Sequence, residues 1–501
     1  MSNNKEQNQI LETGGFIVPQ KQLELDLKMV PFDVWASMAH VLMLHKQKII
    51  DAEKTKKILA ALFSIEKEVH NGNFFVDPGK GAQLTLEAKI IELADDAGQS
   101  VHTGRSRNDQ VIVTELLFLR EKVLSFLPQL MEVVEALLLL AKKNQQMVMP
   151  GYTHMQPAKP TTVGQWVLAY ANAFSRAAQT IMHYYDMYNM NPLGACESYG
   201  TSWFLDREYT AKLLGFKQVW EVPQDAIGSR GFPQLGYLSG LSEVCLVASK
   251  ISQDLILFNM FEFGIIELGQ EVAMRMHPIT GSSVMAQKKN PDVLELIRAT
   301  APQVSGYVGI VSNILDSLFM GYNRDVREVK EYVVMGFYKT TTALNTLENV
   351  IHTVEFNKER MNQLVIKNYS LTTELADYIS QKTGIGYRLI YKIIGTVVDE
   401  AIQNKKTLLE ITAKEIINKA EVFGIDLVLT QKEILEAIDP KIAIEKKKHI
   451  GGTSQKTMSI AIKNTRTKTM MIDKWIKKNQ AYTHNANLNT HILAKKITNK
   501  T

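Results

Sequence analysis

The chain is built on long segments in which apolar residues recur every three or four positions. One such stripe consists of Leu241, Cys245, Ala248, Ile251, Leu255 and Phe258, and another of Val123, Phe126, Leu130, Val133 and Leu137. This spacing places the members of each stripe on one face of an α-helix. Stretches 162–186, 292–318 and 330–355 also read as helical, and strand-like alternation is scarce. The sequence predicts an almost entirely α-helical protein whose helices are long enough to form a bundle.

Composition and charge exclude several classes of protein. The 501 residues are 45% hydrophobic and 22% charged, enough to bury a sizeable core in several packed segments. A net charge of +5 is small for this length, so no nucleic-acid partner is expected. The polar N-terminus MSNNKEQNQI carries no apolar leader, and the longest apolar run, near 136–141, falls far short of the roughly 20 residues that span a bilayer. We expect no contact with membranes.

The number and spacing of the cysteines indicate whether the protein is expected in a reducing or an oxidising compartment of the cell. Only Cys196 and Cys245 occur, far apart in the chain and without a CxxC pair. Neither a disulfide framework nor a zinc ribbon is therefore indicated. A reducing, cytoplasmic location is expected.

Polar and glycine- or proline-rich loops separate the predicted helices, and one reads GSSVMAQKKNPD at 281–292. Asn290 is placed to cap the following helix, and Pro291 suits its first position. Exposed N–H groups at that helix start, together with Lys288 and the Asn290 amide, would favour a carboxylate or a developing oxyanion. The alternative is an ordinary capped helix with solvated lysines.

A second polar segment, HTGRSRNDQ at 102–110, places Arg105 and Arg107 around Ser106 and ahead of Asn108. Planar guanidinium groups and neutral donors in this arrangement suit a dicarboxylate. A surface cluster of ion pairs is the plainer interpretation.

A third segment, PGYTHMQPAKPTT at 150–162, holds Thr153 and His154 in a stretch braced by prolines. A lone histidine is more often structural than catalytic. Together and in this order, however, the three segments resemble the signature of the argininosuccinate lyase branch of the fumarase/aspartase superfamily. Weaker matches extend the resemblance over most of the chain: NPLGA at 191–195, LDRE at 205–208, LADY at 375–378 and GGT at 451–453.

The resemblance implies an all-helical homotetramer in which long central helices form a shared bundle and different subunits contribute the three motif regions to each active site. It implies an N-terminal helical domain at 1–106, a central domain at 107–362 and a C-terminal helical domain at 363–470. Residues 471–501, rich in Asn, Lys and Thr, are expected to form a flexible tail. A small dicarboxylate substrate is implied, with no metal and no organic cofactor.

The family's catalytic roles fall on four residues of this chain. Ser282 corresponds to the serine that removes a proton beside a carboxylate, and Lys288 supports its alkoxide and the dianionic intermediate. His154 corresponds to the partner acid/base, and Glu295 to the carboxylate that raises its basicity. The implied substrate-binding residues are Arg105, Ser106, Arg107, Asn108, Thr153, Asn290, Tyr322, Arg327 and Lys330.

Several positions depart from the family pattern, mostly away from the residues that hold fumarate. Gln22 replaces a serine, Gln83 lies where an acidic and histidine motif is usual, Ala286 replaces a proline, and Arg327 replaces a glutamine that contacts substrate. An arginine near the leaving amine would repel a guanidinium and attract a carboxylate.

These departures leave three hypotheses open. The first is cleavage of argininosuccinate to arginine and fumarate. The second is a sister lyase that releases fumarate from another N-substituted aspartate, such as an aminocarboxylate of the ethylenediamine-disuccinate type. The third, a catalytically silent homologue of the lens-crystallin kind, is disfavoured because the catalytic residues are retained together.

Overall fold

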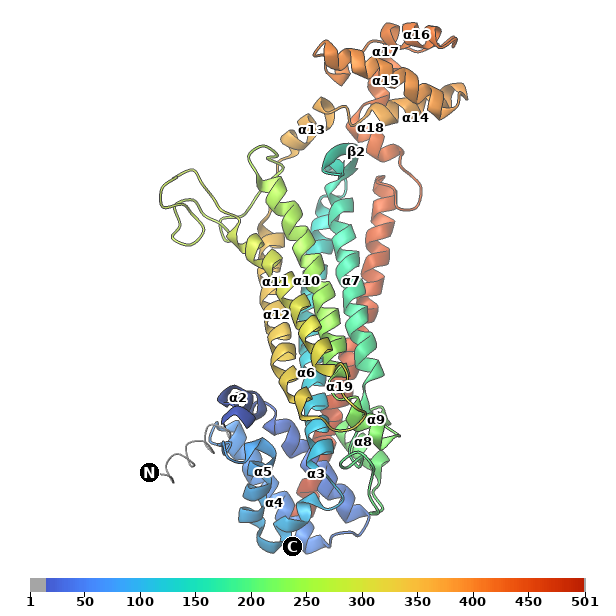
Figure 1. Cartoon of the computed structure of the whole chain (residues 1–501). Coiled ribbons are helices and arrows are strands. Elements are labelled where there is room, and N and C mark those ends of the chain that lie inside the picture. Colours follow the sequence, from blue (N-terminus) through green and yellow to red (C-terminus); the bar gives the residue numbers. More distant parts are fainter. Residues whose placement is uncertain (1–14, 500–501) are drawn as a thin grey trace.

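Long helices running side by side form the centre of the molecule (Figure 1), which is described for residues 15–499 of a computed structural model. The bundle consists of α6 (Arg107–Lys143), α7 (Val163–Met187), α10 (Phe232–Asn259), α11 (Asp292–Leu315), α12 (Val329–Thr353) and most of α19 (Gln455–Thr498). The predicted helical segments at 162–186, 292–318 and 330–355 match α7, α11 and α12 to within three residues. The all-α prediction is confirmed.

Both predicted apolar stripes lie in the core of this bundle. Every member of the stripe on α10 and of the stripe on α6 is buried, and the two helices contribute to the same apolar cluster. By length and composition α6 could cross a membrane, but 61% of its most apolar window is buried against the rest of the protein. Its apolar surface is used for packing between helices.

A helical lobe closes each end of the bundle (Figure 1). The N-terminal lobe contains α2 (Gln20–Leu27), α3 (Val30–Lys46), α4 (Ala52–His70), α5 (Gly81–Ala94), η1 (Asp95–His102), α8 (Arg207–Leu214) and α9 (Pro223–Gly228). The opposite lobe contains α13 (Lys358–Lys367), α14 (Thr372–Thr383), α15 (Tyr387–Gln403), η3 (Leu408–Glu410), α16 (Ala413–Val422), α17 (Gln431–Ala437) and α18 (Pro440–Lys446). Three apolar cores, one in each lobe and one in the bundle, agree with a division into three domains. The borders 1–106, 107–362 and 363–470 remain a proposal, because α8 and α9 join the core of the N-terminal lobe and α19 begins in the bundle.

Strands are few and short in the described part of the chain. The pair β1 (Val148–Thr153) and β2 (Gln156–Thr162) is antiparallel, β3 (Met190–Asn191) and β4 (Gln218–Val219) are parallel, and β5 (Ile266–Glu267) pairs with β6 (Glu355–Phe356). Only the first pair is long enough to form a hairpin. It joins α6 to α7 and carries His154.

The prediction of a flexible tail at 471–501 is wrong for most of that segment. From 471 to Thr498 the chain continues as the second half of α19. Ile472, Ile476 and Ala494 are buried at helical spacing, and the helix reaches the N-terminal lobe, where Ala486 and Ala494 join its core. The polar composition hid this period, because Asn479 and Thr490 also lie on the buried face. Tertiary packing orders the segment despite its composition.

An ion pair fastens the end of α19 to the N-terminal lobe. His491 Nε2 lies 2.7 Å from a carboxylate oxygen of Glu66, and its Nδ1 lies 2.8 Å from the carbonyl oxygen of Asn487. Both ring nitrogens face acceptors, so the imidazolium, which donates from both, is favoured. The hydrogen bond to Glu66 is the main reason that the pKa of His491 is raised.

This pair predicts that stability depends on pH. Because the pKa of His491 is raised by folding, its contribution is fully present below about 6.5, the unfolded value, and is lost as pH rises through the raised value. Relative to His491→Gln, the wild-type chain should gain about 1 kcal/mol at pH 5.5 and little at pH 9. Urea unfolding midpoints at the two pH values measure this; an equal gain at both would contradict it.

Candidate active site

The predicted binding segment HTGRSRNDQ, at 102–110, contains the N-terminus of α6. Ser106 is the N-cap, and its Oγ accepts a hydrogen bond from the N–H of Asn108 at 3.2 Å. The Asn108 side chain donates to the carbonyl oxygen of Glu197 at 3.1 Å. Both polar side chains are thus held in place at a helix N-terminus, where partial positive charge favours a carboxylate.

Asp109 is a residue of this region that the sequence reasoning missed. One carboxylate oxygen accepts from the N–H of Ser106, and the other accepts from the N–H groups of Gly194 and Cys196, all at 3.0 Å. Burial raises the pKa of Asp109 to about 6. The Ser-x-x-Asp spacing of a capping box was the signal available in the sequence.

The two arginines of this segment point in different directions. Arg107 is exposed at the first turn of α6. Arg105 is only 7% exposed and donates to Ser37 Oγ at 3.0 Å, close to the buried Asp33. The predicted contact between Arg105 and substrate is not supported, because α3 supplies polar partners that turn the guanidinium inward.

Tyr322, Arg327 and Lys330 lie at the same end of the bundle, beyond the C-terminus of α11. Arg327, in η2 (Arg324–Glu328), bonds to the Glu328 carboxylate and to the carbonyl oxygen of Ile17. Lys330 forms a nearly buried ion pair with Asp26. The positive charge that distinguishes Arg327 from a glutamine is therefore already compensated within the chain.

Helix α2 covers this corner and carries Gln22, one of the departures from the family pattern. Gln22 is buried, and its amide nitrogen lies 3.5 Å from a carboxylate oxygen of Glu328. Lys21 and Asp26 of the same helix pair with Glu331 and Lys330. The N-terminal helix thus fixes the segment from which substrate contacts were predicted.

Thr153 and His154 lie on the tip of the β1–β2 hairpin. Thr153 pairs with Gln156, so His154 and Met155 form a two-residue turn, and both have positive φ, 53° and 59°. Non-glycine residues rarely adopt this conformation, and such strain often marks a functional position. The turn holds the His154 side chain exposed at the surface.

The loop before α11 places Ser282 in a small backbone cradle. Its Oγ accepts hydrogen bonds from the N–H groups of Val284 at 3.2 Å and Met285 at 2.9 Å. Gly281 closes against His277, where a Cβ would approach the backbone nitrogen to 2.4 Å. Two backbone donors aimed at a hydroxyl oxygen stabilise negative charge on it, as an alkoxide base requires.

The start of α11 differs from the sequence prediction by one residue. The helix begins at Asp292 with Pro291 as its N-cap, so Asn290 does not cap it. Asn290 instead closes the loop, donating from its backbone to Thr280 at 2.9 Å and from its side chain to Gly281 at 3.4 Å. Asp292 and Glu295 occupy the first turn and offset part of the positive helix end.

Lys288 is the outward-facing lysine of the loop. Its neighbour Lys289 turns inward to Glu267, 3.3 Å away, whereas Lys288 is exposed and lines a cleft of about 1020 Å³ together with Asn290. Glu295 is exposed one turn into α11. Ser282, Lys288 and Asn290 thus share one loop that opens to solvent.

Within one chain the predicted site is divided into three separate groups. Ser106 and His154 lie beyond opposite ends of α6, whose 37 residues span roughly 55 Å. The loop of Ser282 and the segment of Tyr322 lie beyond opposite ends of α11 (Figure 1). No hydrogen bond or ion pair between residues 15 and 499 joins the three groups, and the predicted contact of Glu295 with His154 is not formed within a chain.

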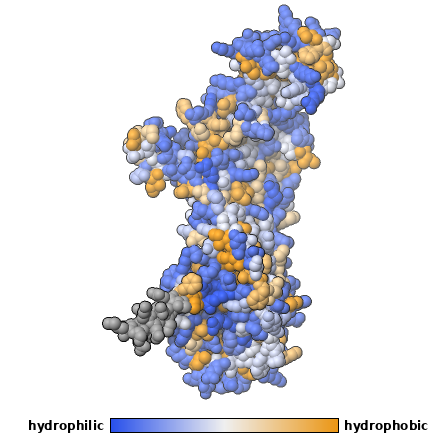
Figure 2. Space-filling view, viewed as in Figure 1, coloured by the Kyte–Doolittle hydropathy of each residue, from blue (hydrophilic) through white to orange (hydrophobic). Residues whose placement is uncertain are grey.

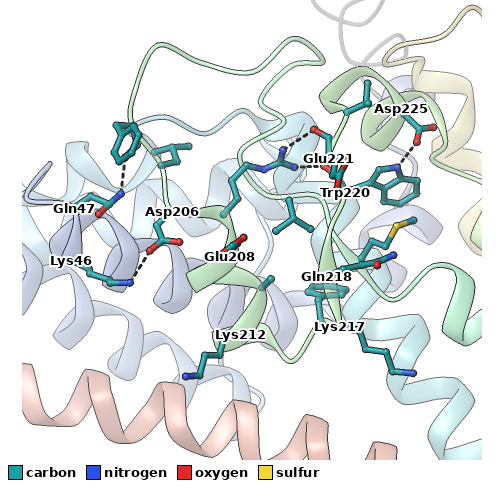
Figure 3. A pocket seen from close by; sticks show the side chains of 18 of the residues that line it. Lys46, Gln47, Asp206, Glu208, Lys212, Lys217, Gln218, Trp220, Glu221 and Asp225 are labelled. Atoms are coloured by element: carbon teal, nitrogen blue, oxygen red, sulfur yellow. Dashed lines mark hydrogen bonds and ion pairs between the residues drawn. The ribbon is translucent and has the colours of Figure 1, made fainter.

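A cavity of about 1320 Å³ lies in the N-terminal lobe, and none of the predicted site residues lines it. Several of its charged groups have partners: Lys46 Nζ lies 2.7 Å from a carboxylate oxygen of Asp206, and the Trp220 indole N–H donates to Asp225 at 2.6 Å. Both contacts are drawn in Figure 3. Arg207 is directed to the carbonyl oxygens of Leu193 and Trp220. This cavity does not present a catalytic set.

Comparison of the chain with known proteins identifies its family. A family model described as lyase matches residues 21–306, and one described as argininosuccinate lyase C-terminal matches 369–445. The argininosuccinate lyase of Methanocaldococcus jannaschii is 34% identical, over 88% of this chain and 89% of that protein. The chain belongs to the argininosuccinate lyase family.

Further relatives agree with this membership. The argininosuccinate lyase of Bacillus cereus is 33% identical over 90% of this chain and 95% of its own length. A crystal structure of EDDS lyase in complex with formate has a TM-score of 0.82 at 25% identity, covering 94% of this chain and 92% of that one. A class II fumarase from Schistosoma mansoni, at 17% identity over 83% of this chain and 90% of its own, has a TM-score of 0.65 and shares the fold. The fold is that of the fumarase/aspartase superfamily, and the chain is a carbon–nitrogen lyase by family.

Proposed function

We propose that this protein eliminates fumarate from argininosuccinate and releases arginine. The observation that carries the proposal is the cradle around Ser282, because its two N–H donors support the base that the reaction needs. The relatives named argininosuccinate lyase, which match most of the chain, support the choice of substrate.

The chemistry assigns one task to each group. Ser282 removes the proton from the carbon beside a carboxylate, and the charge that develops on that carboxylate is stabilised by Lys288 and Asn290. Thr153, Ser106 and Asn108 supply neutral donors to the fumarate half. His154 donates a proton to the departing nitrogen, and Glu295 of another subunit supports its basicity.

The active protein is proposed to be a homotetramer in the cytoplasm. Since one chain separates its three groups, copies must combine to bring them within reach of one small substrate. The outer surface of α11 offers a place for this contact: Leu296 is 70% exposed, and Gly306 and Gly309 have open space around them. Figure 2 shows apolar residues on the bundle and on the projecting loop, where Val284 is 88% exposed. We infer that these exposed apolar residues are where copies of the chain meet.

Cleavage of an aminocarboxylate of the ethylenediamine-disuccinate type is the second candidate. The resemblance to EDDS lyase favours it, as does Arg327 in place of the family's glutamine. The pairing of Arg327 with Glu328 weakens this argument, because the guanidinium is not free to attract a second carboxylate. Argininosuccinate therefore remains the first choice.

A direct assay separates the candidates. Purified protein is incubated with argininosuccinate or with ethylenediamine-disuccinate, and the ultraviolet absorbance of the fumarate double bond is followed. We expect the higher kcat/KM on argininosuccinate. A preference for the aminocarboxylate would establish the second candidate, and no fumarate from either substrate would favour a catalytically silent homologue.

A further inference from the structure

A buried ion pair lies directly behind Tyr322. Arg230 Nη2 and Nε donate to the two carboxylate oxygens of Glu115 at 2.6 and 3.1 Å, and the two side chains are only 3% and 4% exposed. Gln234 donates to the same carboxylate at 3.2 Å. The pair joins α6 to the start of α10, so the position of the guanidinium is fixed by two central helices.

The third nitrogen of this guanidinium is directed at Tyr322. Arg230 Nη1 lies 3.3 Å from the Tyr322 hydroxyl oxygen, and the guanidinium carbon lies 5.5 Å from the centre of its ring. Burial by itself would lower the pKa of Arg230, but Glu115 raises it above its ordinary value. Arg230 is therefore charged whenever the site is folded.

This contact decides the direction of the Tyr322 hydroxyl. A guanidinium has N–H donors and no acceptor, so the phenol oxygen must accept from it. The single phenol proton is then free to point away from Arg230, and Tyr322 is only partly buried. Toward a ligand, Tyr322 can therefore act as a donor, and the acceptor that suits it in an N-substituted aspartate is a carboxylate oxygen.

The turn that carries Arg230 packs closely against the residues on both sides of Tyr322 in the sequence. Gly231, next to Arg230, has φ of +98°, and a Cβ there would approach Leu315 to 2.5 Å and Val326 to 3.0 Å. The end of α11 and the segment carrying Tyr322 are thus pressed against the start of α10. A close approach of this kind fixes geometry at the level that catalysis requires.

We propose that Arg230, held by Glu115, is a positioning residue that sets Tyr322 as a hydrogen-bond donor to a carboxylate of the substrate. This rests on the proposed function, since the ligand is the dicarboxylate substrate or one of its products. Arg230 itself does not touch the substrate. It acts through the orientation of Tyr322.

A double-mutant cycle tests the coupling. Arg230→Lys keeps the charge and one bond to Glu115 but cannot also reach Tyr322, and Tyr322→Phe removes the hydroxyl. Each single variant should raise KM about tenfold while kcat changes less than about threefold. The double variant should be no worse than Tyr322→Phe alone, because Arg230 has nothing left to orient. Arg388→Lys and Tyr391→Phe, exposed in the opposite lobe, are the matched controls.

A second measurement, which does not depend on turnover, tests the inference separately from the proposed function. Calorimetric titration of L-arginine and of fumarate into the same assembled proteins measures binding without turnover. The inference is supported if the effects of the two substitutions on the binding of L-arginine or of fumarate are coupled. Failure of the wild-type protein to cleave argininosuccinate would contradict the proposed function alone. Two results would overturn the inference. One is a rise in KM in the double variant that equals the product of the rises in the two single variants. The other is unchanged binding of both products in Tyr322→Phe.

Discussion

Replacing Ser282 with alanine is expected to lower fumarate release from argininosuccinate by about 10³-fold or more. Ser282 Oγ accepts hydrogen bonds from two backbone N–H groups, and alanine removes this oxygen, so no group on the loop is left to accept the abstracted proton. The substrate should still bind, because Lys288, Asn290 and the other proposed substrate-binding groups remain. The effect should therefore appear in kcat rather than in KM.

Ser283→Ala is the matched control, since Ser283 is the exposed neighbour on the same loop. It should retain turnover within a few-fold of the wild-type rate. Both variants should keep the wild-type elution volume in size-exclusion chromatography and the helical circular-dichroism spectrum, as the loop lies outside the bundle core. Activity of Ser282→Ala within tenfold of wild type would refute the assignment of this serine as the base.

Ending the chain at residue 470 is expected to lower the unfolding free energy by at least about 5 kcal/mol. The removed half of α19 buries Ile472, Ile476 and Ala494 and covers part of the N-terminal lobe. Each buried isoleucine contributes about 2 kcal/mol through apolar burial alone. Thr490 also donates to the carbonyl oxygen of Leu213 at 2.7 Å, and truncation would leave that acceptor with only the longer bond from Trp35 Nε1 at 3.3 Å.

Two point variants separate lost packing from mere shortening of the chain. Ile476→Ala opens a gap in the bundle core and should lower the thermal midpoint clearly, whereas Lys477→Ala, exposed at the next position, should leave it nearly unchanged. A truncated chain as stable as the full one would mean that the second half of α19 contributes nothing to the fold.

The helical bundle could be predicted from the sequence because its helices bury continuous stripes of apolar residues. Leu241 and Phe258, nearly five turns apart on α10, both lie in one core, as the period required. Period alone failed for α19, where polar Asn479 and Thr490 share the buried face with Ile476. Composition indicated disorder there, and only contacts with distant segments could show otherwise.

The site was predictable as motifs but not as geometry. Local spacing placed Ser282 in a loop before a helix, which proved correct, whereas the role of Ser106 as the N-cap of α6 was not predicted. The inward turn of Arg105 depends on Ser37, 68 residues earlier, and the pairing of Lys330 depends on Asp26. Such long-range partners leave no local signal, so the direction of a charged side chain could not be derived from the sequence.

The packing of α19 also constrains the order in which the molecule can be completed during synthesis. The core of the N-terminal lobe combines residues from the first quarter of the chain and from 193–227 with Ala486 and Ala494 of α19. A ribosome synthesises those alanines long after the first segments of the lobe. The lobe must therefore wait, with part of its apolar surface uncovered, until α19 has been made.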